Sequence, residues 1–260
     1  MQKIILYLTI FTFQTTLSSA QEMNVKDSKK SIDKVIFVGG AGFNKTFIRY
    51  VAELTNKPNP KICYIPTATG DSPTTILNWY ANCEDLPLRP YVLRTFINSN
   101  TTPKSFEEVI MSMDAIIVGG GNTLNMMAIW KAQGIDVALK KAYDSGIILS
   151  GGSAGSLCWF TAGSTDSRPK ELTIVEGLNF LNFSHSPHYL KELARRPLYH
   201  ELILSGKLKA GYACDDLAGL LFVNGEVKKS VAQDSENKNY FLSVKDGKIH
   251  EQLLPTEIIK

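Results

Sequence analysis

The chain has 260 residues and 44% hydrophobic content, which is enough for one sizeable core and favours a single domain. Its formal net charge is +3, and no long run of one sign occurs, which argues against nucleic acid as the main partner. The totals therefore indicate a single globular domain whose main partner is not nucleic acid.

The first 20 residues have the pattern of a secretory signal peptide. Lys3 provides the positive start, Ile4 to Phe13 form a short apolar run, and Ser18 to Ala20 offer small residues at a cleavage point. The run is too short to span a bilayer comfortably, and a membrane-surface anchor is the alternative. We therefore expect an exported protein, periplasmic or secreted, with a flexible polar N-terminus at 21–33.

From residue 34 on, strand-like apolar runs alternate with segments of helical spacing. Strands are expected at 34–40, 61–66, 90–96, 114–118 and 147–149. Helices are expected at 44–54, 74–82, 105–113, 123–133 and 136–145. This alternation predicts one α/β domain over residues 34–260, built on a doubly wound, mostly parallel sheet.

The pattern changes after Ser167. Residues 184–189 are expected to form a polar loop with two histidines, followed by a helix at 189–205. Strands are expected at 210–215, 218–223, 226–232, 240–244 and 248–253. Asn224-Gly225 and Asp246-Gly247 are two-residue hairpin turn signals, so the chain is expected to finish with antiparallel hairpins.

The segment from Gly151 to Gly155 has the G-x-S-x-G form of a nucleophile elbow. Small residues flank Ser153, and a helix is expected to begin directly after it. The positive potential of that helix N-terminus would lie where an oxyanion forms. The alternative is a glycine-rich strand-to-helix turn with an incidental serine.

A second glycine turn, Gly119 to Gly121, closes the strand that precedes the elbow strand in the chain. A free N–H from Gly120 or Gly121, together with that of Ala154, would form an oxyanion hole, and Asn122 could cap the next helix. A phosphate-binding loop is the alternative. The full G-x-G-x-x-G spacing with a well-placed acid is missing, which disfavours a nucleotide site.

A serine nucleophile needs a base, and histidine is the usual one. His185 and His188 share one segment near the expected carboxyl edge of the sheet, and we favour His188 because it follows a rigidifying proline. A carboxylate would orient its imidazole. Asp215 and Asp216 follow a predicted strand, and the residues alone barely separate them, although we favour Asp216.

The four cysteines are ambiguous in an exported protein, because oxidising compartments permit disulfides. Three of them lie in or beside apolar strand or helix patterns and are better interpreted as small buried residues. No close pairing of cysteine and histidine suggests zinc. The cysteines are Cys63, Cys83, Cys158 and Cys214.

Four segments together resemble the peptidase E family of serine peptidases, to which cyanophycinases are related. They are Gly119 to Thr123, Ser153 to Gly155, Pro187 to Tyr189, and Asp215-Asp216. The resemblance implies a fold like the class I glutamine amidotransferase domain, which is flavodoxin-like. It favours His188 as the base and Asp216 as the acid, at a position where relatives often have glutamate.

The resemblance also implies hydrolysis of short peptides, with an N-terminal aspartate as one preferred residue. Ser153, His188 and Asp216 would form the triad, Gly121 and Ala154 would stabilise the oxyanion, and no cofactor or metal would be needed. The candidate substrate-binding residues are Asn122, Asp166, Arg195 and Arg196. Either arginine would suit an acidic side chain, and Asp166 would suit a substrate amine.

Two alternatives stay open from the sequence. One is a cyanophycinase-like hydrolase of β-linked aspartyl peptides, and another is a catalytically inactive binding protein on the same fold. An amidotransferase-like enzyme would need a cysteine nucleophile, whereas Ser153 occupies the apex of the turn. The oligomeric state is also open, with a homodimer as one option.

Overall fold

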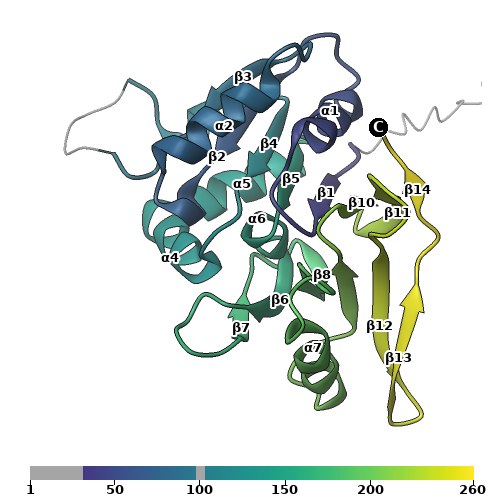
Figure 1. Cartoon of the computed structure of the whole chain (residues 1–260). Helices are drawn as coiled ribbons and strands as arrows, with labels where there is room; N and C mark the ends of the chain where they lie inside the picture. Colours follow the sequence, from purple (N-terminus) through teal and green to yellow (C-terminus); the bar gives the residue numbers. More distant parts are fainter. Residues whose placement is uncertain (1–31, 98–102) are drawn as a thin grey trace, which may run out of the picture. The chain divides into compact units, whose positions relative to one another are not determined.

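The computed structural model describes residues 32–97 and 103–260, so the predicted signal peptide lies outside the described residues. The larger of two sheets contains β1 (Val35–Gly39), β2 (Lys61–Ile65), β3 (Arg89–Val92), β4 (Ala115–Val118), β5 (Ile148–Gly152), β10 (Ala218–Val223), β11 (Glu226–Ala232) and β14 (Glu257–Ile258). Their order is β14-β11-β10-β1-β5-β4-β2-β3 (Figure 1). The five strands from β1 to β3 in this order are parallel, and β10 and β11 are joined antiparallel. The predicted mostly parallel α/β sheet is thus confirmed.

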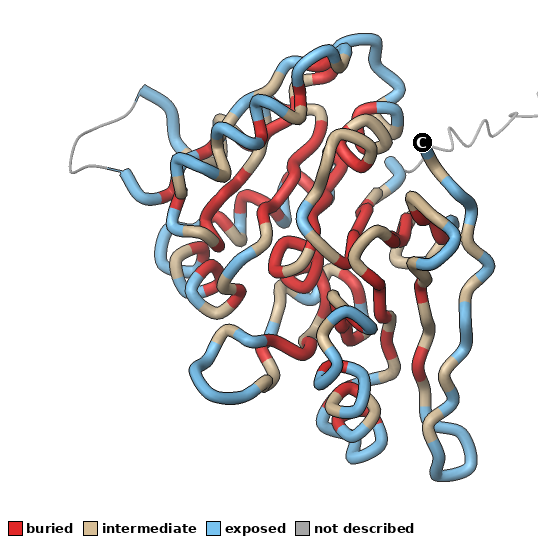
Figure 2. Tube along the Cα trace, viewed as in Figure 1, coloured by how far each residue is buried: buried red, intermediate tan, exposed pale blue. Residues whose placement is uncertain are grey.

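Helices cover both faces of the larger sheet. They are α1 (Lys45–Leu54), α2 (Pro73–Cys83), α3 (Phe106–Met111), α4 (Thr123–Gln133), α5 (Ile135–Asp144) and α6 (Ala154–Leu157), with a short 3-10 turn η1 (Thr67–Thr69). Helix α7 (Arg195–Leu204) packs instead against strands of a second sheet. Side chains of one strand alternate between the faces. Ile117 therefore packs with α1 and α2, whereas Ile116 and Val118 pack with α3, α4 and α5. Figure 2 shows the central strands largely buried, and every residue of β4 and β5 is buried.

A second sheet follows the elbow, and the sequence analysis missed half of it. Its strands are β6 (Phe160–Thr165), β7 (Thr173–Glu176), β8 (Leu181–Ser186), β9 (Gly211–Cys214), β12 (Asn239–Lys245) and β13 (Lys248–Leu253). Their order is β13-β12-β9-β8-β6-β7. The hairpins β10–β11 and β12–β13 are those that the two turn signals predict.

The expected polar loop at 184–189 is wrong, because its first half is the end of β8. Ser184, His185 and Ser186 are buried, and each has a polar partner inside the protein. The hydropathy pattern did not indicate a strand here, because its polar side chains form hydrogen bonds inside the protein rather than with water. The helix expected at 189–205 begins only at Arg195, since the preceding segment forms turns.

All four cysteines are buried and unpaired, which confirms the interpretation as small buried residues. Burial raises the pKa of the Cys63 thiol to about 12. None of the helices formed by residues 32–97 and 103–260 is long and apolar enough to cross a membrane.

Candidate active site

The elbow places Ser153 between the end of β5 and the start of α6. Ser153 has φ 55° and ψ −119°, a conformation that a non-glycine residue rarely adopts. The flanking glycines permit the close packing that forces this turn. A Cβ at Gly152 would overlap the Ala41 carbonyl oxygen, and a Cβ at Gly155 would overlap that of Val118. Backbone contacts therefore require Gly155 of the G-x-S-x-G pattern and also Gly152, which lies within the pattern.

Ser153, His188 and Asp216 are joined by two hydrogen bonds. The Oγ of Ser153 lies 2.9 Å from Nε2 of His188, and Nδ1 of His188 lies 2.7 Å from Oδ1 of Asp216. When Asp216 accepts the Nδ1–H, the neutral ring presents Nε2 as the acceptor for the Ser153 hydroxyl. The backbone N–H of His188 donates to the Gly40 carbonyl at 3.3 Å, which holds the ring above the end of β1.

Asp215 has a different environment from its neighbour Asp216. Its Oδ1 accepts the backbone N–H of Leu190 at 3.1 Å, and its Oδ2 accepts that of Lys238 at 2.9 Å. Burial raises the pKa of this carboxyl above its ordinary value. Asp215 thus ties two loops together, whereas Asp216 reaches the imidazole. The structure therefore gives different hydrogen-bond partners to two residues that the sequence alone barely distinguishes as candidates for orienting the imidazole.

His185 lies inside the protein rather than in a loop. Its ring stacks on Phe160 with centroids 4.5 Å apart, and its Nδ1 lies 3.0 Å from the Tyr212 carbonyl oxygen. Its Nε2 is 2.9 Å from Oγ of Ser156, which is 2.7 Å from the backbone oxygen of Ser153. Burial lowers the pKa of His185 to about 3. This histidine therefore supports the elbow through Ser156 as a neutral ring.

The turn from Gly119 to Gly121 lies against the elbow. A Cβ on Gly120 would come within 3.1 Å of the Ser153 Cβ and 3.5 Å of its Oγ. Gly121 has φ 132°, and its η1-facing side leaves no room for a Cβ. Within the described residues, the backbone N–H groups of Gly120, Gly121 and Ala154 donate to no other group. They are thus free to bind an anionic oxygen.

Asn122 caps α4 rather than pointing freely into the site. Its side-chain oxygen accepts the Asn125 backbone N–H at 2.9 Å, and its Nδ2 donates to the Ser167 carbonyl at 3.0 Å. The amide therefore fixes the end of the glycine turn against the loop after β6.

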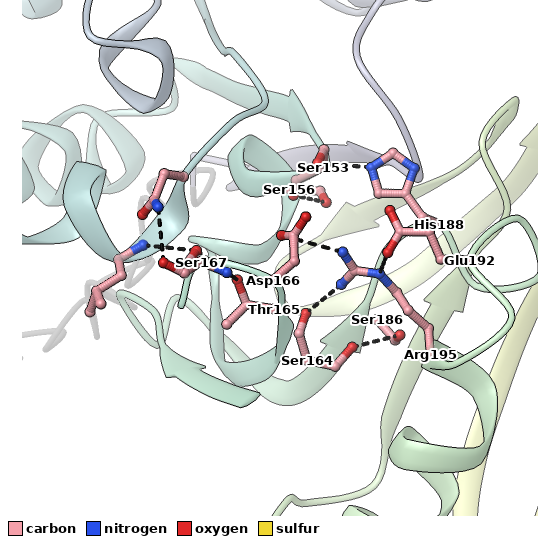
Figure 3. A network of polar contacts seen from close by, with 12 residues as sticks. Ser153, Ser156, Ser164, Thr165, Asp166, Ser167, Ser186, His188, Glu192 and Arg195 are labelled. Carbon is pink, nitrogen blue, oxygen red and sulfur yellow. Dashed lines mark hydrogen bonds and ion pairs between the residues drawn. The ribbon is translucent and has the colours of Figure 1, made fainter. Parts of the chain in front are cut away.

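A charged cluster of Asp166, Glu192 and Arg195 lies beside the His188 turn (Figure 3). The buried guanidinium of Arg195, 3% exposed, donates from Nε to Glu192 at 2.6 Å and from Nη1 to the Ser164 carbonyl at 2.8 Å. Its Nη2 lies 3.5 Å from Oδ1 of Asp166, a side chain that is 65% exposed. Two carboxylates and one guanidinium leave the cluster with a net charge of −1.

Sequence reasoning found Asp166 and Arg195 but missed Glu192. The signal was present, because Glu192 precedes Arg195 by three residues, the spacing of an i,i+3 ion pair. Arg196 lies apart from this cluster. Its guanidinium makes two hydrogen bonds to Glu251 in β13, at 2.7 and 3.1 Å, where Tyr189 and His200 also bind that carboxylate.

The described residues contain no group of three or more His, Cys, Asp or Glu side chains placed to hold a metal ion.

Comparisons with known proteins agree on one family. The sequence model of peptidase family S51 matches residues 28–230. An uncharacterized peptidase of Bacillus subtilis (strain 168), YgaJ, is 38% identical over 231 residues, covering 87% of this chain and 99% of its own length.

Two solved structures share the fold. A peptidase from an acI-B1 actinobacterium has a TM-score of 0.68 at 18% identity, covering 88% of this chain and 97% of its own. A putative peptidase E protein from Listeria monocytogenes EGD-e has a TM-score of 0.55 at 20% identity, covering 75% and 96%. At these identities the likeness concerns the fold.

Proposed function

The chain belongs to peptidase family S51 and is a serine-type peptidase, and from this premise we propose that it hydrolyses short peptides with Ser153, His188 and Asp216 as its triad. The observation that carries the proposal is the unbroken hydrogen-bonded sequence Ser153–His188–Asp216. A base that is itself oriented by a carboxylate is the arrangement that activates a serine hydroxyl.

In this mechanism, Ser153 Oγ attacks the scissile carbonyl carbon while His188 Nε2 accepts the hydroxyl proton. The carbonyl electron pair moves onto the oxygen. When it returns, the C–N bond breaks and His188 donates the proton to the leaving amine. A water molecule then attacks the acyl-enzyme with His188 again as base, which releases the acid and restores Ser153. Asp216 holds the imidazole and stabilises its protonated form throughout.

The backbone N–H groups of Gly121 and Ala154 are proposed to stabilise the oxyanion. Both are free of other partners among residues 32–97 and 103–260, and Ala154 is the first residue of α6, where the helix dipole favours negative charge. Loss of one such donor typically costs about 10²–10³ in kcat.

The cluster of Asp166, Glu192 and Arg195 supports binding of a substrate that has a free amino terminus. Its net negative charge attracts an ammonium group, and the Asp166 carboxylate is the more exposed of the two carboxylates, at 65% against 39% for Glu192. An aspartate preference, which the resemblance to peptidase E implies, would require Arg195 to release a carboxylate that it now binds. Arg196 would likewise have to leave Glu251. We therefore propose that this site recognises the free amine of a dipeptide rather than an aspartate side chain.

The test is hydrolysis of a panel of Xaa-Leu dipeptides, with Xaa covering all side-chain classes, by the wild-type protein and the Ser153→Ala variant. Serine-dependent cleavage together with labelling of the wild-type protein by a fluorophosphonate is expected. Turnover that survives in the Ser153→Ala variant would overturn the mechanism. A folded protein that neither cleaves nor labels would support the binding-protein alternative.

The proposed location is outside the cytoplasm, on the signal-peptide pattern of residues 1–20. Fractionation of expressing cells, followed by N-terminal sequencing, is expected to find a chain beginning at Gln21 in the exported fraction. A full-length chain confined to the cytoplasm would contradict export.

A further inference from the structure

A cavity of about 360 Å³ opens beside Ser153, on the face of the larger sheet that α1 and α2 cover. It reaches Gly120, the residue whose Cβ would lie 3.5 Å from the Ser153 Oγ. The cavity therefore ends at the glycine turn that borders the nucleophile. Its size falls within the usual range of small-ligand sites, about 300–1,000 Å³.

Three aromatic side chains, Phe43, Tyr64 and Trp79, form part of the wall of this cavity. The rings of Tyr64 and Trp79 stack with centroids 5.3 Å apart and an interplanar angle of 15°. Phe43, from the loop after β1, lines the same space. The Tyr64 hydroxyl lies so close to Gly119 that a Cβ at that glycine would overlap it. Such a preformed aromatic wall suits a large apolar or aromatic group.

No Asp, Glu, Lys, Arg or His side chain is among the residues that line the cavity. The polar side chains of α2 that line it are neutral, and they include Asn78 and Asn82, which lie one helical turn apart. A charged group entering here would lose hydration without gaining an opposite charge, which is unfavourable. The lining therefore selects an uncharged occupant.

The cavity and the charged cluster approach Ser153 from different faces of the larger sheet. Phe43, Tyr64 and Trp79 pack in the core beneath α1 and α2. The strand β6, which leads into Asp166, begins at Phe160 in the core on the other face. Ser153, at the end of β5, lies between the two. If the amine of a peptide binds at the cluster and its scissile carbonyl lies at Ser153, the residue after the scissile bond extends away from the cluster, toward the cavity.

We propose that this cavity binds the side chain of the residue that follows the scissile bond, and that it selects large uncharged side chains. The assignment rests on the proposed function, because it takes Ser153 as the nucleophile and the charged cluster as the site of the amine. It adds a specificity that the triad does not determine: Ala-Phe and Ala-Leu are expected to be better substrates than Ala-Asp and Ala-Lys.

The test is to place a charge in the cavity and follow specificity on both sides of the scissile bond. Asn82→Lys is expected to raise the ratio of kcat/KM for Ala-Asp over Ala-Leu by about tenfold, since opposite charges attract strongly at a partly buried site. Asn82→Asp is expected to raise the ratio for Ala-Lys over Ala-Leu. Ala81→Lys is the matched control, because it puts the same charge on an exposed position of the same helix, outside the lining.

Alanine methyl ester, whose leaving group carries no side chain, tests the proposed function separately from the cavity assignment. Its Ser153-dependent hydrolysis is expected to stay within about threefold in both Asn82 variants, since the ester does not reach the cavity. Intact ester hydrolysis with an unchanged dipeptide preference in the Asn82 variants would overturn the cavity assignment alone. A shift in preference for the residue before the scissile bond, measured with Xaa methyl esters, would overturn it too. Absence of Ser153-dependent hydrolysis of every substrate would overturn the proposed function and the cavity assignment with it.

Discussion

Ser153 and His188 hydrogen-bond to each other from backbone conformations that non-glycine residues rarely adopt, with φ of 55° and 53°. Residues held in such regions cost on the order of 1–3 kcal/mol each, and they persist where the surrounding structure over-determines them. Here the packing of Gly152 against Ala41 holds the serine, and the bond to the Gly40 carbonyl holds the histidine. Strain in both partners is therefore concentrated at their contact.

The first prediction concerns this strain. Ser153→Gly is expected to be more stable than Ser153→Ala by about 1 kcal/mol, because glycine adopts positive φ without a steric cost. Both variants lack the hydroxyl and are expected to lose turnover. Urea unfolding of the two variants measures the difference. If the alanine variant is equally or more stable, the turn does not store strain at residue 153.

The second prediction separates the two adjacent acids. Asp216→Asn is expected to lower kcat by roughly 10²–10⁴ with little change in stability, because the amide misorients the imidazole. Asp215→Asn is expected to lower stability by about 1–3 kcal/mol and kcat less, since its carboxylate binds two backbone N–H groups. Steady-state kinetics and urea unfolding of both variants check this. Equal kinetic effects would remove the distinction between them.

The third prediction concerns the glycine turn. Gly120→Ala places a methyl group 3.1 Å from the Ser153 Cβ, tighter than ordinary van der Waals contact, so the methyl group crowds the nucleophile. A loss of kcat/KM with a nearly unchanged melting temperature is expected. Gly121→Ala is the contrasting variant, because its φ of 132° and the overlap with Ala68 make it destabilising. Melting curves and kinetics of this pair distinguish crowding from misfolding.

The fourth prediction is a pH dependence caused by His185. Burial lowers the pKa of this ring to about 3 from an ordinary 6.5. The unfolded chain therefore binds a proton between these values while the folded protein does not. The stability that the protein has with a neutral His185 is fully present above pH 6.5. As the pH falls from 6.5 toward 3, the free energy of unfolding decreases by up to ~1.4 kcal/mol per pH unit.

Unfolding free energies of His185→Gln, measured from pH 7 to pH 4, are expected to fall less steeply than those of the wild type. His250→Gln, at an exposed position on β13, is the matched control and should follow the wild-type slope. A wild-type slope in the His185 variant would show that another group controls acid unfolding.

The fifth prediction tests recognition of the substrate amine. Asp166→Asn removes the exposed carboxylate of the charged cluster, and kcat/KM for free dipeptides is expected to fall about tenfold. Hydrolysis of N-acetylated dipeptides should change little, because they carry no ammonium group. Asp246→Asn, in the distal β12–β13 turn, serves as the control. A uniform loss on both kinds of substrate would argue against amine binding.

Local patterns in the sequence are enough to predict part of the fold. The alternating strands and helices up to β5, the two glycine turns and both C-terminal hairpins follow from periodicity and turn chemistry, which act between near neighbours. The resemblance to peptidase E, carried by four short segments, is confirmed by the family match over residues 28–230.

Features that depend on residues far apart in the chain become defined when the protein folds. His188 meets Ser153 across 35 positions and Asp216 across 28, so local pattern could not choose it over His185, or Asp216 over Asp215. Strand β8 escaped detection because its polar side chains are satisfied by partners from other elements. The charges around Arg195 and the neutral lining of the cavity beside Ser153 are likewise products of folding, since side chains far apart in the chain acquire common surroundings only when the sheets assemble.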